Sequence, residues 1–247
     1  MESAVSLPPA LPLPNRILDE PLIRLRGVTK SYQTAGGNFF ALKGIDLDVY
    51  PGEFLGILGK SGAGKTTLIN MVTGVDHLTE GEVWLGDTPL HQLNENQLAQ
   101  WRGRNLGIIY QSFYLMPSLS LLQNVTLPMD VCGLYRNGDS QKRALELLRM
   151  VELEEHAHKH PSAISGGQQQ RVAIARALAN DPPIIVADEP TGDLDKNSAR
   201  EILGLMEGLN QEFGKTIIMV THDPRAAQTA RKLIYLDKGV LSQNDSS

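Results

Sequence analysis

The segment GKSGAGKTT at residues 59–67 constrains the fold more than any other, because it fits the pattern G-x-x-x-x-G-K-[ST]. The apolar run FLGIL precedes it at 54–58 and predicts a strand. Apolar residues at helical spacing follow it: Leu68, Met71, Val72 and Val75. A glycine-rich turn between a strand and a helix start directs backbone N–H groups and the positive helix end at an anion. The segment therefore predicts a phosphate-binding loop.

The side chains of this loop have distinct expected roles. Lys65 supplies a full positive charge to the β- and γ-phosphates of a nucleotide, and the Thr66 hydroxyl is placed to ligate Mg²⁺. We expect the whole loop to contact the nucleotide: Gly59, Lys60, Ser61, Gly62, Ala63, Gly64, Lys65, Thr66 and Thr67.

Two acidic residues follow another apolar run, in IIVADEP at 184–190. Asp188 and Glu189 would lie at the carboxyl end of a strand, where α/β sheets place their ligands. We expect Asp188 to hold Mg²⁺ through water and Glu189 to polarise the attacking water. Two acids that only cap a strand are the alternative, and the phosphate-binding loop makes it the weaker one.

Four short apolar runs are typical of strands buried on both faces of a parallel sheet: 54–58, 106–110, 184–187 and 216–220. Helical spacing between them, as in 198–213, predicts an α/β domain with right-handed crossovers. Before the first run, apolar and charged residues alternate around Ile23 and Ile45. This alternation predicts half-exposed antiparallel strands, joined by a turn at 34–38.

The chain is expected to have one large domain with two appendages. Prolines mark residues 1–21 as an extended arm. The domain covers 22–240 and includes a mostly helical insertion at about 95–162, in which 140–153 has a clear helical pattern. Residues 241–247 form a tail.

A second anion-binding pattern, ISGGQQQR at 164–171, resembles the signature motif of the ATP-binding cassette (ABC) ATPases. Four other segments match that family in order and type: Tyr32, Gln111 in IYQSF, TGDLD at 191–195 and His222 in VTHD. The resemblance covers about residues 22–240, and Ile164 stands where leucine is usual. It implies a P-loop NTPase core, ATP and Mg²⁺ as cofactors, and ATP hydrolysis as the activity.

The resemblance also implies a role for each matching residue. Tyr32 is expected to stack on adenine, Gln111 to act in catalysis and on Mg²⁺, and His222 to contact the γ-phosphate. The signature would cover the ATP of a second subunit packed head to tail, through Ser165, Gly166, Gly167 and Gln168. Asp195 would link the two sites across the dimer interface. Taken singly, these residues could instead be surface packing, an ordinary loop glutamine and a core histidine.

Composition limits the partners of such a subunit. The net charge of −5 argues against nucleic-acid binding. The single cysteine, Cys132, excludes an internal disulfide and fits a reducing cytoplasm. The sequence has neither a signal peptide nor an apolar run long enough to span a membrane, so a membrane connection is expected through a partner.

The segment after Gln111 is similar to the lipoprotein-releasing and macrolide-exporter type of ABC protein. This similarity implies an ATPase on the cytoplasmic side of the inner membrane, powering a separate permease that exports or extracts lipoprotein, lipid or a hydrophobic compound. Exposed residues at 113–116 would be the docking surface: Phe113, Tyr114, Leu115 and Met116. The alternative is that these residues pack within the helical insertion.

Other functions fit less well. A non-transport ATPase that pulls on a membrane regulator of cell-wall enzymes remains the main alternative. A GTPase would carry N-K-x-D, a small-molecule kinase would not use SGGQQQR, and a DNA-repair ATPase would need long insertions. Lys65, Glu189 and His222 argue against an inactive scaffold. The alternating His156, His158 and His160 have poor geometry for a metal site.

Overall fold

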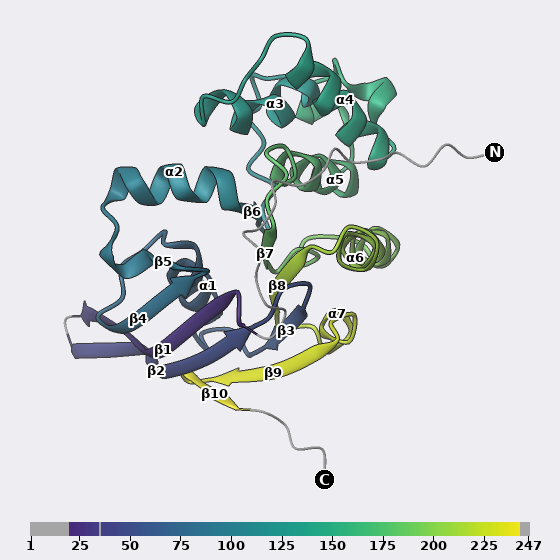
Figure 1. Cartoon of the computed structure of the whole chain (residues 1–247). Coiled ribbons are helices and arrows are strands. Elements are labelled where there is room, and N and C mark those ends of the chain that lie inside the picture. The colour runs from purple at the N-terminus through teal and green to yellow at the C-terminus, as the bar shows by residue number, and fades with distance from the viewer. Residues whose placement is uncertain (1–19, 35, 243–247) are drawn as a thin grey trace.

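The computed structural model describes residues 20–34 and 36–242, which form two β-sheets with helices between and beside them (Figure 1). Residues 1–19 of the predicted arm and 243–247 of the predicted tail lie outside this range. The remaining tail residues, Leu241 and Ser242, belong to the last strand.

The N-terminal sheet is antiparallel, as the alternating pattern predicts. It contains β1 (Ile23–Thr34), β2 (Gly37–Val49), β4 (Glu80–Leu85) and β5 (Thr88–Pro89), in the order β2-β1-β4-β5. Ile23 lies opposite Val49 and Leu25 opposite Leu47, and all four side chains are buried. Successive strand residues point to opposite faces, so the intervening charged residues are directed away from this core.

The second sheet is parallel except at one edge. Its order is β10-β9-β3-β8-β7-β6, and only β10 is antiparallel to its neighbour. The strands are β3 (Phe54–Leu58), β6 (Leu106–Ile109), β7 (Ile184–Asp188), β8 (Thr216–Thr221), β9 (Lys232–Asp237) and β10 (Val240–Ser242). The four apolar runs in the sequence therefore correspond to four of its strands.

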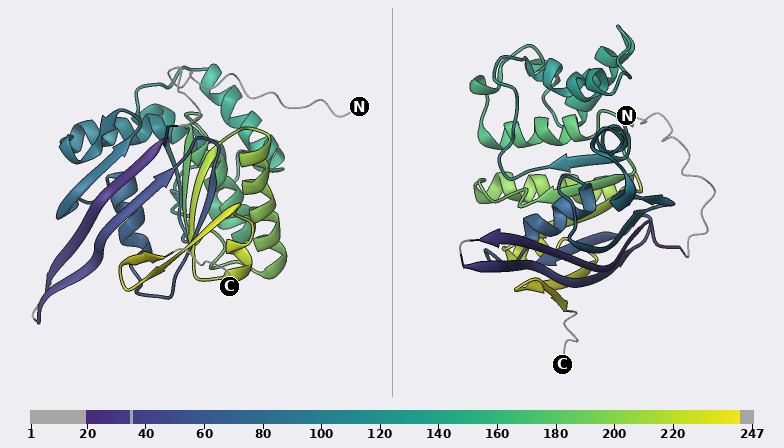
Figure 2. Two further views of the ribbon diagram at one scale, coloured as in Figure 1. Left: turned by 60° about the horizontal axis from the view of Figure 1, so that its bottom comes forward. Right: turned by 90° about the vertical axis from the view of Figure 1, so that its left-hand side faces the viewer.

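Different helices cover the two faces of the parallel sheet. Ile184 and Val186 of β7 pack into the core that contains α1 (Lys65–Thr73) and the antiparallel sheet. Ile185 and Ala187, which point the other way, pack into the core that contains α5 (Gly166–Ala177) and α6 (Lys196–Gln211). Figure 2 shows the antiparallel sheet on one side of the parallel strands and these helices on the other.

Three of the four remaining helices pack into one or the other of the two cores. The four are α2 (Glu95–Asn105), α3 (Leu121–Val131), α4 (Asp139–Met150) and the short α7 (Pro224–Ala227). Short 3-10 turns lie at Leu90–Gln92, Glu154–His156 and Pro161–Ala163. Leu98 of α2 packs in the first core, whereas α3 and α4 pack in the second.

The insertion expected at about 95–162 contains α2, α3 and α4, and also β6, which matches the strand expected at 106–110. One helix boundary needs correction. The helix after the phosphate-binding loop stops at Thr73, because Gly74 takes a left-handed conformation with φ of 62° and caps it. Val75, expected on the buried face of that helix, is consequently 49% exposed.

Candidate nucleotide site

The carboxyl ends of the parallel strands bring the predicted site residues to one edge of the sheet. Leu58 pairs with Thr221, Asp188 with Val220, and Ile109 with Ala187, so these strands end side by side. A cleft of about 800 Å³ lies along this edge. Its lining includes Gly59, Lys60, Ser61, Lys65, Gln111, Glu189 and His222.

The phosphate-binding loop depends on two glycines that lie against other backbone segments. A Cβ on Gly64 would lie 2.6 Å from the Ala41 carbonyl oxygen, and its φ of 107° suits only glycine. A Cβ on Gly59 would lie 2.6 Å from the Leu236 carbonyl oxygen. The loop therefore bends tightly around Lys65, whose ammonium donates to the carbonyls of Gly59 at 2.9 Å and Lys60 at 3.2 Å.

Glu189 lies between two nitrogen groups, the ammonium of Lys65 and the imidazole of His222. Its Oε1 is 3.2 Å from the Lys65 ammonium, and its Oε2 is 2.7 Å from Nδ1 of His222. The backbone N–H of His222 donates to the same Oε2 at 3.2 Å. The glutamate has a φ of 50°, a conformation that non-glycine residues seldom adopt and that recurs at functional sites. The carboxylate is thus held in one orientation at the cleft.

Asp188 has the features of a metal-binding carboxylate. The Thr66 hydroxyl donates to its Oδ2 at 3.0 Å, while its buried Oδ1 has no hydrogen-bond partner among the described residues. Burial raises the pKa of Asp188, and the hydrogen bond from Thr66 only partly offsets this. A buried carboxylate oxygen without a donor, next to a hydroxyl, suits a hard cation such as Mg²⁺. These residues therefore fit the expected ion.

Replacing Asp188 by asparagine is expected to stabilise the nucleotide-free protein and to remove its response to Mg-ATP. At neutral pH the folded state must keep a carboxylate whose pKa is raised, so an amide of the same shape should increase the free energy of unfolding by about 1 kcal/mol. Thermal melts with and without Mg-ATP measure both effects. An asparagine variant that still gains stability from Mg-ATP, as the parent does, would contradict a metal role for Asp188.

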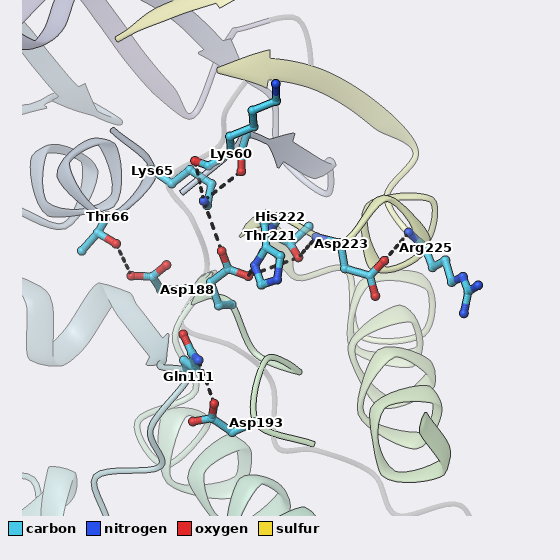
Figure 3. Close-up of polar contacts among 12 residues, drawn as sticks. Lys60, Lys65, Thr66, Gln111, Asp188, Asp193, Thr221, His222, Asp223 and Arg225 are labelled. Atoms are coloured by element: carbon cyan, nitrogen blue, oxygen red, sulfur yellow. Dashed lines mark hydrogen bonds and ion pairs between the residues drawn. The ribbon is translucent and has the colours of Figure 1, made fainter. Parts of the chain in front are cut away.

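Gln111 lies in the cleft but is tied to a neighbouring loop. Its Nε2 donates to Oδ1 of Asp193 at 2.8 Å, and its side chain packs against Gly192. Figure 3 shows the amide oxygen pointing away from Asp193, towards Asp188. The oxygen that a metal would need is therefore directed into the site, while the nitrogen is anchored.

The signature residues lie at the start of α5, away from this cleft. Ser165 caps the helix: its hydroxyl accepts from the N–H of Gln168 at 3.3 Å, and the Gln168 side chain accepts from the N–H of Ser165. None of residues 165–168 lines the cleft. Because α5 and α1 cover opposite faces of the parallel sheet, the two predicted anion-binding ends do not meet within one chain.

A family model described as ABC transporter matches residues 42–192. The chain belongs to the ABC transporter family. It is accordingly an ATPase with a P-loop NTPase core.

Three known ABC proteins illustrate the relationship. The lipoprotein-releasing system ATP-binding protein LolD of Idiomarina loihiensis is 39% identical over 91% of this chain and 98% of its own length. The macrolide export ATP-binding/permease protein MacB of Syntrophobacter fumaroxidans is 42% identical over 89% of this chain, which spans 31% of that longer protein. A Methanocaldococcus jannaschii cassette, solved as a dimer in a post-hydrolysis state with ADP and Pi, has a TM-score of 0.83. That structure is 43% identical and covers 90% of this chain and 97% of its own.

The first turn of α6 in this ABC protein provides an unexpected contact with the signature helix. A Cβ on Gly167 would lie 2.6 Å from the Ser198 hydroxyl, so only glycine fits there. Ser198 in turn donates to Asp195 at 2.6 Å. Asp195, expected at a dimer interface, also accepts from two backbone N–H groups as the cap of α6. These hydrogen bonds, that from Ser198 first, lower the pKa of Asp195.

The predicted adenine platform of the cassette, Tyr32, lies on β1 and does not line the cleft. The residue is 37% exposed, and its hydroxyl donates to Oδ2 of Asp76 at 3.0 Å. Burial first, and then Asp76, raise the pKa of Tyr32. The hydroxyl is therefore neutral and serves as a donor at physiological pH.

The predicted docking loop of the cassette is only partly exposed. Tyr114 is 65% and Met116 47% exposed, but Phe113 and Leu115 are half-buried, and Leu115 packs on the second core. The expectation of four exposed side chains is therefore wrong for two of them, because the loop turns alternate residues inward.

Sequence reasoning missed one buried residue in this cassette. Gln170 is fully buried in α5, and its Nε2 donates to the carbonyls of Tyr110 at 3.1 Å and Pro190 at 2.7 Å. It thereby links the signature helix to the segments that lead to Gln111 and follow Glu189. Its position on the same helical face as Ala173, Ile174 and Ala177 could have revealed a buried polar contact.

Neither a metal cluster nor a membrane span is evident in the described part of the cassette. Within residues 20–34 and 36–242, no group of three or more histidine, cysteine, aspartate or glutamate side chains could hold a metal ion. In the same residues, no helix is both long and apolar enough to cross a bilayer.

Proposed function

We propose that this ATPase works as a homodimer that binds ATP between the phosphate-binding loop of one chain and the signature of the other. One observation carries the proposal: α1 and α5 cover opposite faces of the parallel sheet, so one chain cannot close its own site. A dimeric relative of the same fold, solved with ADP and Pi, supports it. Two helix N-termini would then face the γ-phosphate from opposite sides.

Within each site, the chain supplies positioning and charge. The loop 59–67 would hold the phosphates. The ammonium of Lys65 would release the two loop carbonyls and the Glu189 carboxylate that it contacts here and would bind the phosphates instead. Thr66, Asp188 and the Gln111 oxygen would hold Mg²⁺, which when bound neutralises charge between the phosphates. Glu189 would accept a proton from the attacking water, and His222 would hold that water and the γ-phosphate. No covalent step on the protein is needed.

We further propose that the work is transport through a separate permease, with the chain held peripherally at the cytoplasmic face of the inner membrane. The similarity to LolD and MacB supports a lipoprotein, lipid or hydrophobic compound as the transported substrate. The loop at 113–116 would receive the permease. Its attachment supports this role, because Arg176 of α5 donates to the carbonyls of both Phe113, at 2.8 Å, and Tyr114.

Charges placed on the exposed part of this loop should detach the protein from membranes without changing its basal ATPase rate. We expect Tyr114→Asp/Met116→Asp to lower the membrane-bound fraction in cells at least about tenfold, because apolar contact area is replaced by ions that resist desolvation. Flotation of native membranes measures this fraction. Val240→Asp is the matched control, since Val240 is equally exposed but lies on the edge strand β10.

Membrane binding that survives both substitutions, while the variant remains folded, would contradict docking at this loop. The class of substrate needs a second experiment with the complex purified from native membranes. In proteoliposomes, a lipid-anchored protein or apolar compound should stimulate ATP hydrolysis and be released, whereas a hydrophilic solute should do neither. Stimulation by the partner without release of any compound would favour the non-transport alternative.

A further inference from the structure

A charged pair, Lys30 and Asp76, lies beside Tyr32. Lys30, two residues earlier on β1, places its ammonium 2.7 Å from Oδ1 of Asp76 and 2.6 Å from the His77 carbonyl. The same ammonium lies over the Tyr32 ring, 4.9 Å from its centroid. Asp76 thus contacts both the hydroxyl of the ring and the cation above one of its faces.

This arrangement leaves one face of the ring for a ligand. A cation over an aromatic face is attracted to it and excludes other groups from that face. The Lys30 side chain is only 12% exposed, and the ion pair with Asp76 compensates for the burial of its ammonium. Without this carboxylate, we expect the ammonium to turn towards water and the ring to lose both restraints.

Asp76 also connects the ring to the helix that begins at the phosphate-binding loop. The N–H groups of Val75 and Asp76 both donate to the carbonyl of Asn70, in α1, at 3.0 and 3.4 Å. Two further bonds fasten β1 to the segment after α1. The Thr79 N–H donates to the Thr29 carbonyl at 2.8 Å, and the Ser31 N–H donates to the Thr79 hydroxyl at 3.0 Å. The ring and the phosphate-binding loop are therefore placed relative to the same helix.

We propose that Asp76 is a positioning residue for the base of the bound nucleotide. It fixes the Tyr32 ring next to the helix that begins at the phosphate-binding loop, and it holds Lys30 against the face that the base does not use. The inference rests on the proposed role of Tyr32 as the adenine platform. It adds a specific dependence: base stacking requires an acidic side chain after α1.

The test separates contacts to the base from contacts to the phosphates. KM for ATP is measured together with the inhibition constant of inorganic triphosphate, which has no base. Asp76→Ala and Tyr32→Phe should each raise KM for ATP about fivefold, because each removes the hydrogen bond that orients the ring. The inhibition constant of triphosphate should stay within about twofold, because the loop that binds it is unchanged.

The double variant Tyr32→Phe/Asp76→Ala should have a KM for ATP no higher than that of the worse single variant, because both changes remove the same hydrogen bond. Asp48→Ala is the matched control, because Asp48 is an acid on the same sheet that pairs with Arg26 at 2.7 Å. Asp76→Asn provides a second variant of nearly unchanged shape if the alanine form folds poorly.

Three results would overturn the proposal, and they are distinguishable. If Tyr32→Ala raises KM for ATP but neither Asp76→Ala nor Asp76→Asn does, Asp76 does not position the ring. If triphosphate inhibition weakens as much as ATP binding, Asp76 acts on the phosphate-binding loop instead. If Tyr32→Ala leaves KM unchanged, Tyr32 is not the adenine platform, and the role expected for it from the sequence fails, while the proposed ATP-bound dimer is unaffected.

Discussion

Glu189→Gln is expected to lower kcat for ATP at least about a hundredfold, the typical contribution of a positioned general base. Glutamine keeps the shape of the side chain and can still accept a hydrogen bond from the N–H of His222. It cannot take a proton from water. Binding should persist, because the phosphate contacts come from the loop around Lys65 and not from Glu189.

The same variant should accumulate as an ATP-bound dimer, because the nucleotide that joins the two chains is no longer hydrolysed. Size-exclusion chromatography with light scattering, at saturating Mg-ATP, measures the dimer. Glu53→Gln is a matched control: Glu53 is also a half-buried glutamate, 2.9 Å from the ammonium of Lys232, but it lies outside the cleft. A Glu189→Gln chain that stays monomeric at saturating ATP would contradict the proposed closure of the dimer around ATP.

Mixing two inactive variants should restore activity if each site is shared between chains. Lys65→Ala removes the phosphate-binding cation, and Ser165→Arg blocks the signature, so each homodimer should fall below about 1% of the parent rate. Half of the dimers in an equal mixture are heterodimers, and each has one intact site. The mixture should therefore recover up to about a quarter of the parent rate.

The chain offers a close control for the signature change. Ser120 caps α3 with the same reciprocal pair of hydrogen bonds, to Gln123, that Ser165 forms with Gln168. Ser120→Arg should cost about 1 kcal/mol of stability through the lost cap and leave ATP hydrolysis unchanged. No recovery in a mixture whose heterodimers are confirmed by differential tags would contradict shared sites that act independently.

Local patterns were sufficient to predict the phosphate-binding loop and the strands that carry Asp188, Glu189 and His222. In each case a buried run of apolar residues ends where a polar or glycine-rich segment begins, and the parallel sheet brings these ends together. Helix ends were predicted less well, since a single residue, Gly74, ended α1 before Val75. The strand within 95–162, in contrast, was predicted at 106–110, because its apolar run stands out from the polar and helical segments on either side.

Contacts between distant parts of the sequence could not be predicted. Asp76 is separated from Tyr32 by 44 positions, and nothing in either segment identifies the other as a partner. The helical spacing could have revealed the burial of Gln170, but not its two partners, the carbonyls that follow strands β6 and β7. Whether loop residues such as Leu115 turn inward depends on the packing of α3 to α5, for which the loop sequence carries no periodic signal.

The contacts along helix α5 have a mechanical consequence. The 12 residues of the helix form a rod about 18 Å long. Ser165 lies at one end, and Arg176, near the other end, donates hydrogen bonds to the carbonyls of the loop at 113–114. Gln170, between them, is buried, and its amide donates to the carbonyls of Tyr110 and Pro190, so the middle of the helix is fixed. The ring of Phe113 also lies beside Gly166, so the loop contacts this helix at both ends. A displacement of the loop would therefore act directly on the end of the helix that carries Ser165.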